Sequence, residues 1–154
     1  MAQEIERKFL VARPPDDLAD WDAQRIEQGY LAITPEVEVR VRRRAGQALL
    51  TIKSAPALVR VEEELPIDER RFAALWPLTD GRRLVKTRHV REAGGVVYEL
   101  DVYEAGLEGL MTLEVELPDE AAATAFTPPA WAGADVTGDA RYANQSLALH
   151  GLPA

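Results

Sequence analysis

The chain has 154 residues, with 18 lysine and arginine residues against 26 aspartate and glutamate residues, and a formal net charge of −8. This length suits one domain, since domains typically run to about 100–150 residues, and we expect a single domain over residues 1–154. The acidic balance argues against a general nucleic-acid binder, which normally presents a basic face. The lack of cysteine excludes disulfides, thiolate zinc sites and cysteine catalysis.

Charge is divided unevenly along the chain. Residues 1–91 hold 15 acids and 17 bases (net +2), and residues 92–154 hold 11 acids and one base (net −10), which together give −8. This asymmetry suggests that the basic and acidic elements have different roles. The charged N-terminus lacks the apolar core of a signal peptide. No apolar run approaches the about 20 residues of a membrane span, so we expect a cytoplasmic protein that does not bind membranes.

Alternating polar and apolar side chains predict most of the secondary structure, because a strand turns successive side chains to opposite faces. Eight strands are expected, at residues 3–12, 26–33, 36–44, 48–54, 58–65, 82–91, 96–103 and 110–117.

Three short helices complete the prediction. Asp68 can cap the first, after which Phe72, Leu75 and Trp76 form an apolar stripe. The second spans residues 118–126, and the third starts at Thr137 or Asp139 and stops at Gly151.

The predicted strands carry charges on their polar faces. In one arrangement the apolar faces fill a barrel or sandwich and the charges face water. In the other, the charges line a lumen and the apolar faces point outward, beneath the helices. Alternation alone cannot choose between the two. Charges are almost never fully buried unless they are paired or bound to a metal, which favours the first arrangement. Two features weigh towards the second, because the amphipathic helices need an apolar sheet surface to cover and because acids and bases are sorted onto different strands.

The acids recur in i, i+2 pairs, which place two oxygen donors roughly 6–7 Å apart on one face. Like charges so close raise each other's pKa unless a cation lies between them. Mg²⁺ prefers oxygen ligands and is commonly held by carboxylates together with substrate phosphates. Arginine grips phosphate bidentately and lysine adds a compact charge. A lumen lined by carboxylates on one side and by basic side chains on the other suits a metal-bound polyphosphate, although the net charge of the chain is negative.

Short motifs follow one another in order along almost the whole chain. They are Glu4-Ile5-Glu6-Arg7-Lys8, Gln28-Gly29-Tyr30-Leu31, Glu38-Val39-Arg40-Val41-Arg42, Thr51-Ile52-Lys53-Ser54, Arg60-Val61-Glu62-Glu63-Glu64, Lys86-Thr87-Arg88, Glu99-Leu100-Asp101 and Glu114-Val115-Glu116. This series resembles the CYTH, or triphosphate tunnel metalloenzyme, superfamily, and its short bacterial inorganic triphosphatase-like members in particular. The resemblance implies an α+β fold, in which an eight-stranded antiparallel β-barrel forms a tunnel with a charged lumen and short helices packed outside.

The resemblance also implies an activity, the hydrolysis of inorganic triphosphate to pyrophosphate and phosphate with a divalent cation, Mg²⁺ or alternatively Mn²⁺. Thiamine triphosphatase, class IV adenylyl cyclase and a non-enzymatic polyphosphate- or nucleotide-binding module remain as alternatives. The expected partner is a small-molecule triphosphate, with no nucleic acid and no membrane, and the chain is expected to be a monomer or a homodimer.

The family pattern assigns roles to the charged residues. The expected metal ligands are Glu4, Glu6, Glu114 and Glu116. The acids expected to hold a second metal or to orient water are Glu62, Glu64, Glu99 and Asp101. The expected phosphate ligands are Lys8, Arg40, Arg42, Lys53, Arg60, Lys86 and Arg88.

Catalysis is expected to involve Tyr30, Lys53 and Lys8. In the family, a tyrosine at the position of Tyr30 pairs with the lysine that corresponds to Lys53 and is proposed as the proton acceptor. A nearby ammonium would lower the tyrosine pKa from about 10. The alternatives are that Tyr30 only packs and that a metal-activated water does the attack. His89 falls on the opposite face of its strand from Lys86, which favours a packing role.

Overall fold

The computed structural model describes residues 5–55 and 61–154, which fold into eight strands and several short helices. The strands are β1 (Ile5–Leu10), β2 (Asp22–Ile33), β3 (Val37–Arg44), β4 (Gln47–Ser54), β5 (Glu62–Ile67), β6 (Arg83–Ala93), β7 (Val96–Glu104) and β8 (Met111–Leu117). The α-helices are α1 (Glu69–Leu75), α2 (Glu120–Ala125) and α3 (Asn144–His150). The 3₁₀ helices are η1 (Leu18–Asp20), η2 (Trp76–Thr79) and η3 (Ala140–Tyr142).

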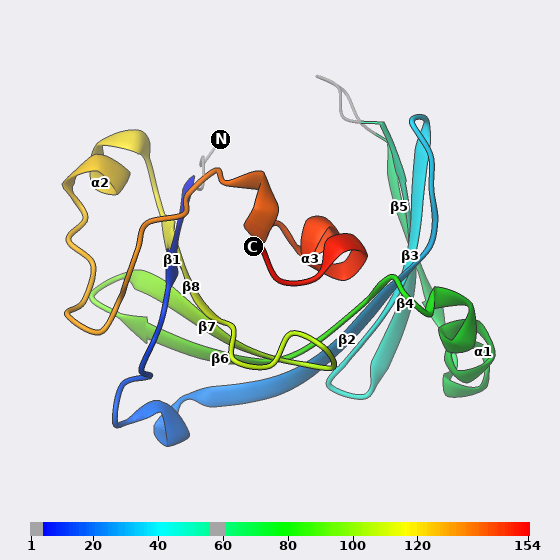
Figure 1. Cartoon of the computed structure of the whole chain (residues 1–154), viewed down its shortest axis with the longest axis horizontal. Coiled ribbons are helices and arrows are strands. Elements are labelled where there is room, and N and C mark those ends of the chain that lie inside the picture. Colours follow the sequence, from blue (N-terminus) through cyan, green and yellow to red (C-terminus); the bar gives the residue numbers. More distant parts are fainter. Residues whose placement is uncertain (1–4, 56–60) are drawn as a thin grey trace.

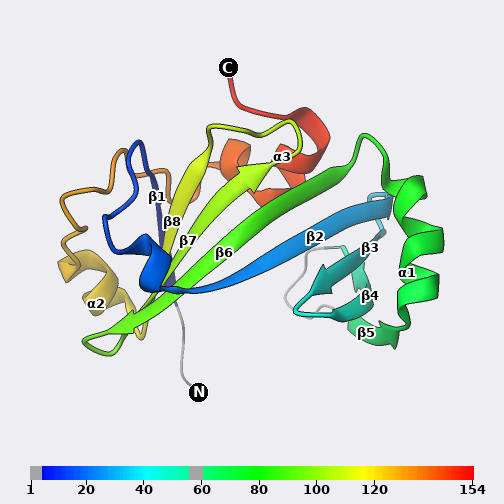
Figure 2. The same ribbon diagram turned by 90° about the horizontal axis from the view of Figure 1, so that it is seen from below.

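All eight strands belong to one antiparallel sheet with the order β1-β8-β7-β6-β2-β3-β4-β5. The sheet curves into a deep trough, with β1 and β8 in one wall, β3, β4 and β5 in the other, and α3 inside (Figure 1). Viewed from below, the long strands β2 and β6 run across the floor and connect the two walls (Figure 2). The predicted α+β class and antiparallel eight-stranded sheet are confirmed.

The apolar faces of the walls point outward, beneath the helices. Phe72 of α1 packs with Val41 and Ala48 on the outside of one wall. Ala123 of α2 packs with Leu113 in the cluster on the outside of the other. The expected caps are present, because the side chains of Asp68 and Asp119 accept hydrogen bonds from backbone N–H groups of the first turns of α1 and α2. The charged strand faces are therefore left to line the trough.

The C-terminal helix lies on the inner side. Its Leu147 is 1% exposed and packs with Tyr30, Leu84 and Tyr103, which belong to the floor and one wall. This helix starts later than the sequence predicts, because the Asp139 cap opens only the 3₁₀ helix η3, and α3 begins at Asn144.

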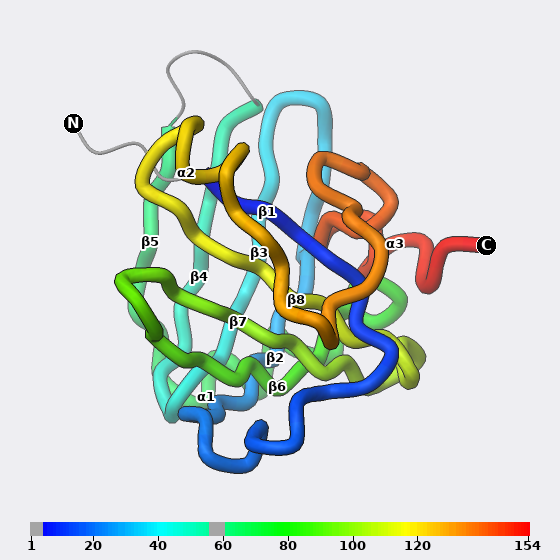
Figure 3. The backbone as a smooth tube through the Cα atoms, turned by 90° about the vertical axis from the view of Figure 1, so that its left-hand side faces the viewer, coloured from blue at the N-terminus to red at the C-terminus, as the bar shows by residue number. Residues whose placement is uncertain are grey.

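The sheet is not closed into the predicted barrel, since the described parts of β1 and β5 form no ladder with each other. The outer edge of β1 has other partners. The Leu10 N–H donates to the Ala134 carbonyl (2.9 Å), and the Val136 N–H donates to the Lys8 carbonyl (2.8 Å). The backbone of residues 132–137 therefore runs along β1 (Figure 3) and takes hydrogen bonds that a closing strand would need. None of the helices in the described residues is long and apolar enough to cross a membrane.

Candidate active site

One wall of the trough gathers carboxylates from three adjacent strands. Glu6 of β1 lies directly opposite Glu116 of β8, and Glu114 of β8 lies opposite Glu99 of β7. Partial desolvation, followed by the charges of Glu114 and Glu99, raises the pKa of Glu6 above its usual value. Negative charge is therefore concentrated here, as the sequence predicts for a cation site.

These acids fit a divalent metal by their chemistry, because they are hard oxygen donors whose mutual repulsion a cation would relieve. Within residues 5–55 and 61–154, no three histidine or acidic side chains stand close enough to hold an ion as they are. The charge of Glu114 is compensated instead by Lys8, whose Nζ lies 3.4 Å from Oε1, and by Arg88, whose Nη2 lies 3.8 Å from Oε2. Glu4, the fourth expected ligand, lies outside the described residues.

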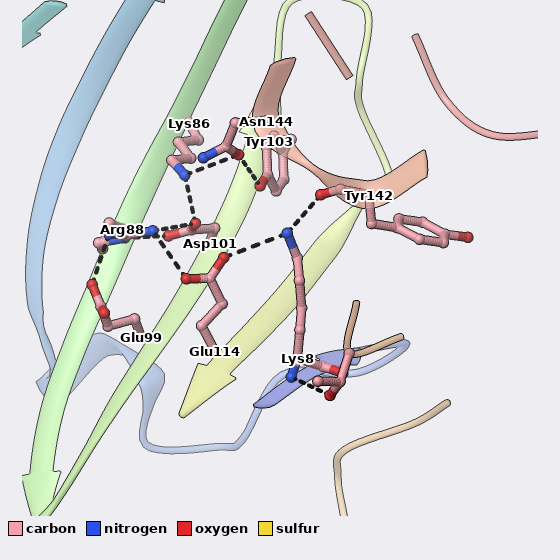
Figure 4. A network of polar contacts seen from close by, with 10 residues as sticks. Lys8, Lys86, Arg88, Glu99, Asp101, Tyr103, Glu114, Tyr142 and Asn144 are labelled. Carbon is pink, nitrogen blue, oxygen red and sulfur yellow. Dashed lines mark hydrogen bonds and ion pairs between the residues drawn. The ribbon is translucent and has the colours of Figure 1, made fainter. Parts of the chain in front are cut away.

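A buried ion network occupies the floor beside this wall (Figure 4). The Lys86 Nζ donates to Asp101 Oδ2 at 2.7 Å. Arg88 donates to both oxygens of Asp101, each at 2.9 Å, and forms an ion pair of 2.7 Å with Glu99. Burial would raise the pKa of Asp101, but the hydrogen bonds from Arg88 and the charge of Lys86 hold it below its usual range. Asp101 and Glu99 were expected to hold a second metal or orient water, and here they face cations.

Two arginines of β3, Arg40 and Arg42, belong to the opposite wall. Burial, and then repulsion from Arg40 and Arg44, lowers the pKa of Arg42. The Arg40 Nε is buried and has no hydrogen-bond partner among the described residues. Neither Arg40 nor Arg42 forms an ion pair with the part of the chain that is described. Guanidinium groups that face a trough without an ion pair are suited to an anionic ligand.

The outer strand of this wall carries the remaining acids of the predicted set. Glu62 lies 3.8 Å from the Nζ of Lys53, and the charge of Glu64 acts on Arg42. Both acids are exposed on β5. The structure thus places them with the bases and away from Glu6. Arg60, expected to bind phosphate, falls outside the described residues.

Tyr30 does not have the environment expected of a base activated by lysine. Its side chain is 2% exposed, and its hydroxyl accepts a hydrogen bond from Gln28 Nε2 (3.2 Å). Burial, and then the charge of Glu38, raises the pKa of Tyr30, whereas a paired ammonium would lower it. In the ladders, Tyr30 lies opposite Arg40 while Lys53 lies opposite Glu38, so register separates the two residues.

The C-terminal segment supplies site residues that the sequence did not reveal. The Tyr142 carbonyl accepts a hydrogen bond from Lys8 Nζ (2.6 Å), and Gln145 Nε2 donates to Glu38 Oε1 (3.1 Å). A cavity of about 330 Å³ lies between Glu6, Lys8 and Glu114 on one side and residues 136–144 on the other. The sequence predicts a terminal helix that starts at Thr137 or Asp139, but a helix start does not indicate which strands the helix meets.

A curved antiparallel sheet with clustered carboxylates on one wall and arginines on the other defines a class of proteins whose inner sheet face is suited to metal-complexed anions. Within that class, this chain belongs to the CYTH family, whose domain model matches residues 2–135. Membership of this family of metalloenzymes implies a metal.

Relatives extend the match over almost the whole chain. An inorganic triphosphatase of Nitrosomonas europaea is 47% identical over 148 residues, which are 95% of this chain and 97% of the relative. An inorganic triphosphatase of Acetivibrio thermocellus is 35% identical over 151 residues, or 96% and 94% of the two chains. A crystal structure of an inorganic triphosphatase superimposes with a TM-score of 0.86 at 44% identity and covers 99% of each chain.

Proposed function

We propose that this chain is a metal-dependent inorganic triphosphatase, which hydrolyses triphosphate to pyrophosphate and phosphate. The observation that carries the proposal is the opposition of two walls. One wall has the carboxylates of Glu6, Glu114 and Glu116, and the other has the guanidinium groups of Arg40 and Arg42, which form no ion pair within the described residues. A linear polyanion between them would satisfy the arginines, and its metal would satisfy the acids.

The chain's cations bind and orient the phosphates. We assign Lys8, Arg40, Arg42, Lys53 and Arg88 to the phosphate oxygens, and Arg60 remains a further prediction. Fixed positive charge lowers the repulsion that an attacking water meets at phosphorus, and such preorganised charge is usually the largest single contribution to catalysis. Because Lys8 already donates to a backbone carbonyl and lies near Glu114, it is held close to where the anion would enter.

The metal would be held by Glu6, Glu114 and Glu116, with Glu4 as the fourth predicted ligand. We propose Mg²⁺, with Mn²⁺ as the alternative, because these ions take hard oxygen ligands. When bound, the ion supplies Lewis-acid polarisation of a phosphate oxygen or of water.

We further propose that the trough works as a tunnel. The C-terminal segment supports this, since it lies inside the trough and reaches both walls (Figure 1). Lys8 of one wall contacts Tyr142, and Glu38 of the other contacts Gln145. A ligand beneath this segment would be shielded from water, which strengthens its interactions with charged side chains.

Inorganic triphosphate is favoured over nucleotides because the tryptophans lie outside the trough. Trp21 packs against Trp131 with ring centroids 6.2 Å apart, and Trp76 stacks on Phe72 at 5.3 Å, in both cases beneath the outer helices and loops. Tyr30 and Tyr103, on the inner side, are buried under α3. These two inner rings are therefore not available for an adenine to stack on.

The test is a panel of phosphate release from triphosphate, ATP and thiamine triphosphate in the presence of Mg²⁺, with a parallel assay for cyclic AMP. We expect triphosphate to be hydrolysed at least about tenfold faster than the other two substrates, with no cyclic AMP. Equal rates, or tight binding without turnover, would sink the proposal and favour one of the alternatives.

A further inference from the structure

Lys86 is the most enclosed cation of the site. Its side chain is 3% exposed, whereas those of Lys8 and Lys53 are 15% and 19% exposed. Its Nζ lies 2.7 Å from Asp101 Oδ2 and 5.5 Å from the centre of the Tyr103 ring. The ammonium is thus already matched by a charge and covered by an aromatic face.

The helix α3 closes the remaining side of this ammonium. The Asn144 Oδ1 lies 3.5 Å from Lys86 Nζ and accepts a second hydrogen bond from the Tyr103 hydroxyl at 3.2 Å. Figure 4 shows Lys86, Asn144 and Tyr103 meeting at one end of the network, away from Glu114 and Lys8. A phosphate could reach Nζ only by displacing Asn144 or breaking the pair with Asp101.

Asp101 connects Lys86 to a more accessible cation. Its side chain is fully buried, and its two oxygens take three donors, one from Lys86 and two from Arg88. The guanidinium of Arg88 is held by Nε and Nη2, while Nη1 extends to Glu99 and the group keeps 15% exposure. Asp101 therefore fixes the plane of Arg88, and Lys86 fixes Asp101 from the other side.

We propose that Lys86 is a positioning residue, which holds the Asp101 carboxylate and through it the Arg88 guanidinium, and that it does not contact the triphosphate. The inference rests on the proposed function in one respect, namely that Arg88 binds the phosphates of the substrate. It replaces the sequence-based expectation that Lys86 binds phosphate.

The first experiment measures which lysines the ligand covers. The chain has three lysines, Lys8, Lys53 and Lys86, so acetylation with limiting acetic anhydride followed by mass spectrometry reports on each separately. We expect Lys86 to be acetylated at least about tenfold more slowly than Lys53. Pyrophosphate with Mg²⁺ should protect Lys53 and leave the slow rate of Lys86 unchanged. Fast labelling of Lys86 that pyrophosphate suppresses would overturn the proposal.

The second experiment is a double-mutant cycle with Arg88. We expect Lys86→Met to lower kcat about tenfold while the KM for triphosphate changes less than about twofold, because substrate binding loses no direct contact. In an Arg88→Ala background, Lys86→Met should lower kcat less than about twofold further. Full additivity would show that Lys86 acts on the substrate independently of Arg88.

The matched control is Lys53→Met, because Lys53 lies on the other wall. This substitution should lower kcat by the same factor whether residue 88 is arginine or alanine. The acetylation experiment uses the unaltered chain, so it shows whether the ligand contacts Lys86 even if Lys86→Met does not fold. A chain that lacks triphosphatase activity and shows no protection of Lys53 would refute the proposed function. The rate at which Lys86 is acetylated would then still test whether this lysine is enclosed as proposed.

Discussion

Arg88 and Asp101 lie directly opposite each other on β6 and β7 and are joined by two hydrogen bonds of 2.9 Å, with the carboxylate completely buried. A carboxylate without solvent is costly unless it is paired with a cation and hydrogen-bonded, and here Lys86 supplies a third donor beside the two from Arg88. This arrangement makes the Arg88–Asp101 pair the rigid centre of the floor.

We expect Asp101→Asn to destabilise the fold by about 3–5 kcal/mol, because it leaves the buried ammonium of Lys86 without its counter-charge and removes one of the carboxylates that pair with Arg88. Urea unfolding followed by circular dichroism would measure the change. The control is Asp68→Asn, since Asp68 pairs with Arg71 at the exposed start of α1 and asparagine caps helices equally well. Similar losses for the two variants would contradict the central role of Asp101.

The lowered pKa of Asp101 predicts an acid-labile fold. A carboxyl whose folded-state pKa lies below its unfolded value of about 3.9 contributes stability that is complete above that value. This stability is lost as the pH falls through the folded pKa. The free energy of unfolding should therefore decline below about pH 4, and the decline should be smaller in Asp101→Asn. An unchanged decline in the variant would assign acid sensitivity to other groups.

We expect Arg42→Met to stabilise the empty protein and to weaken substrate binding. Burial and the neighbouring Arg40 and Arg44 disfavour the charge of Arg42, so removing it should raise the free energy of unfolding by roughly 1 kcal/mol. The KM for triphosphate should rise at least about tenfold. Thermal unfolding and steady-state kinetics measure the two effects.

Arg43→Met is the matched control for this prediction. Arg43 follows Arg42 on the same strand but points outward, where it pairs with Glu27 and Glu69 and lies over the Phe72 ring. Its loss should lower stability and leave the KM unchanged. A rise in KM for Arg43→Met, or a stability loss for Arg42→Met, would contradict the division of the wall into two faces.

Tyr30 offers a test of its role as a base through pH. Because its pKa is raised, its phenolate fraction is small at neutral pH and grows about tenfold per pH unit until the pKa is reached. If Tyr30 is the proton acceptor, kcat rises with pH through the alkaline range and Tyr30→Phe removes that rise. A parallel profile in the variant would show that Tyr30 only packs beneath α3.

Removal of metal should abolish tight binding of triphosphate. Without a cation, the anion would face the carboxylates of Glu6 and Glu114, and we expect titration calorimetry in EDTA to show at least about a hundredfold weaker binding than with Mg²⁺. Glu114→Gln should raise the Mg²⁺ concentration needed for half-maximal activity, whereas Glu63→Gln, at an exposed position of β5, should not. Strong binding in EDTA would mean that the carboxylates have been assigned wrongly.

Which side chains share a face of a strand follows from the amino-acid sequence alone. Alternation placed the charges of β1, β3, β6, β7 and β8 on one side of each strand, and Asp68, Phe72 and Trp76 marked the helix that covers the other side. These features are local, since a strand repeats every two residues and a cap acts within one turn. The family motifs then identified the class of ligand.

Which charges are paired depends on how the strands assemble. Lys86 and Arg42 look alike in the sequence as bases of two i, i+2 motifs, yet Lys86 is matched by Asp101 and Arg42 has no ion partner among the described residues. Strand order and register set those partners, and they also separate Tyr30 from Lys53 and bring Tyr142 to Lys8. Alternation assigns a residue to a face, but charge pairing depends on residues brought together from strands far apart in the chain.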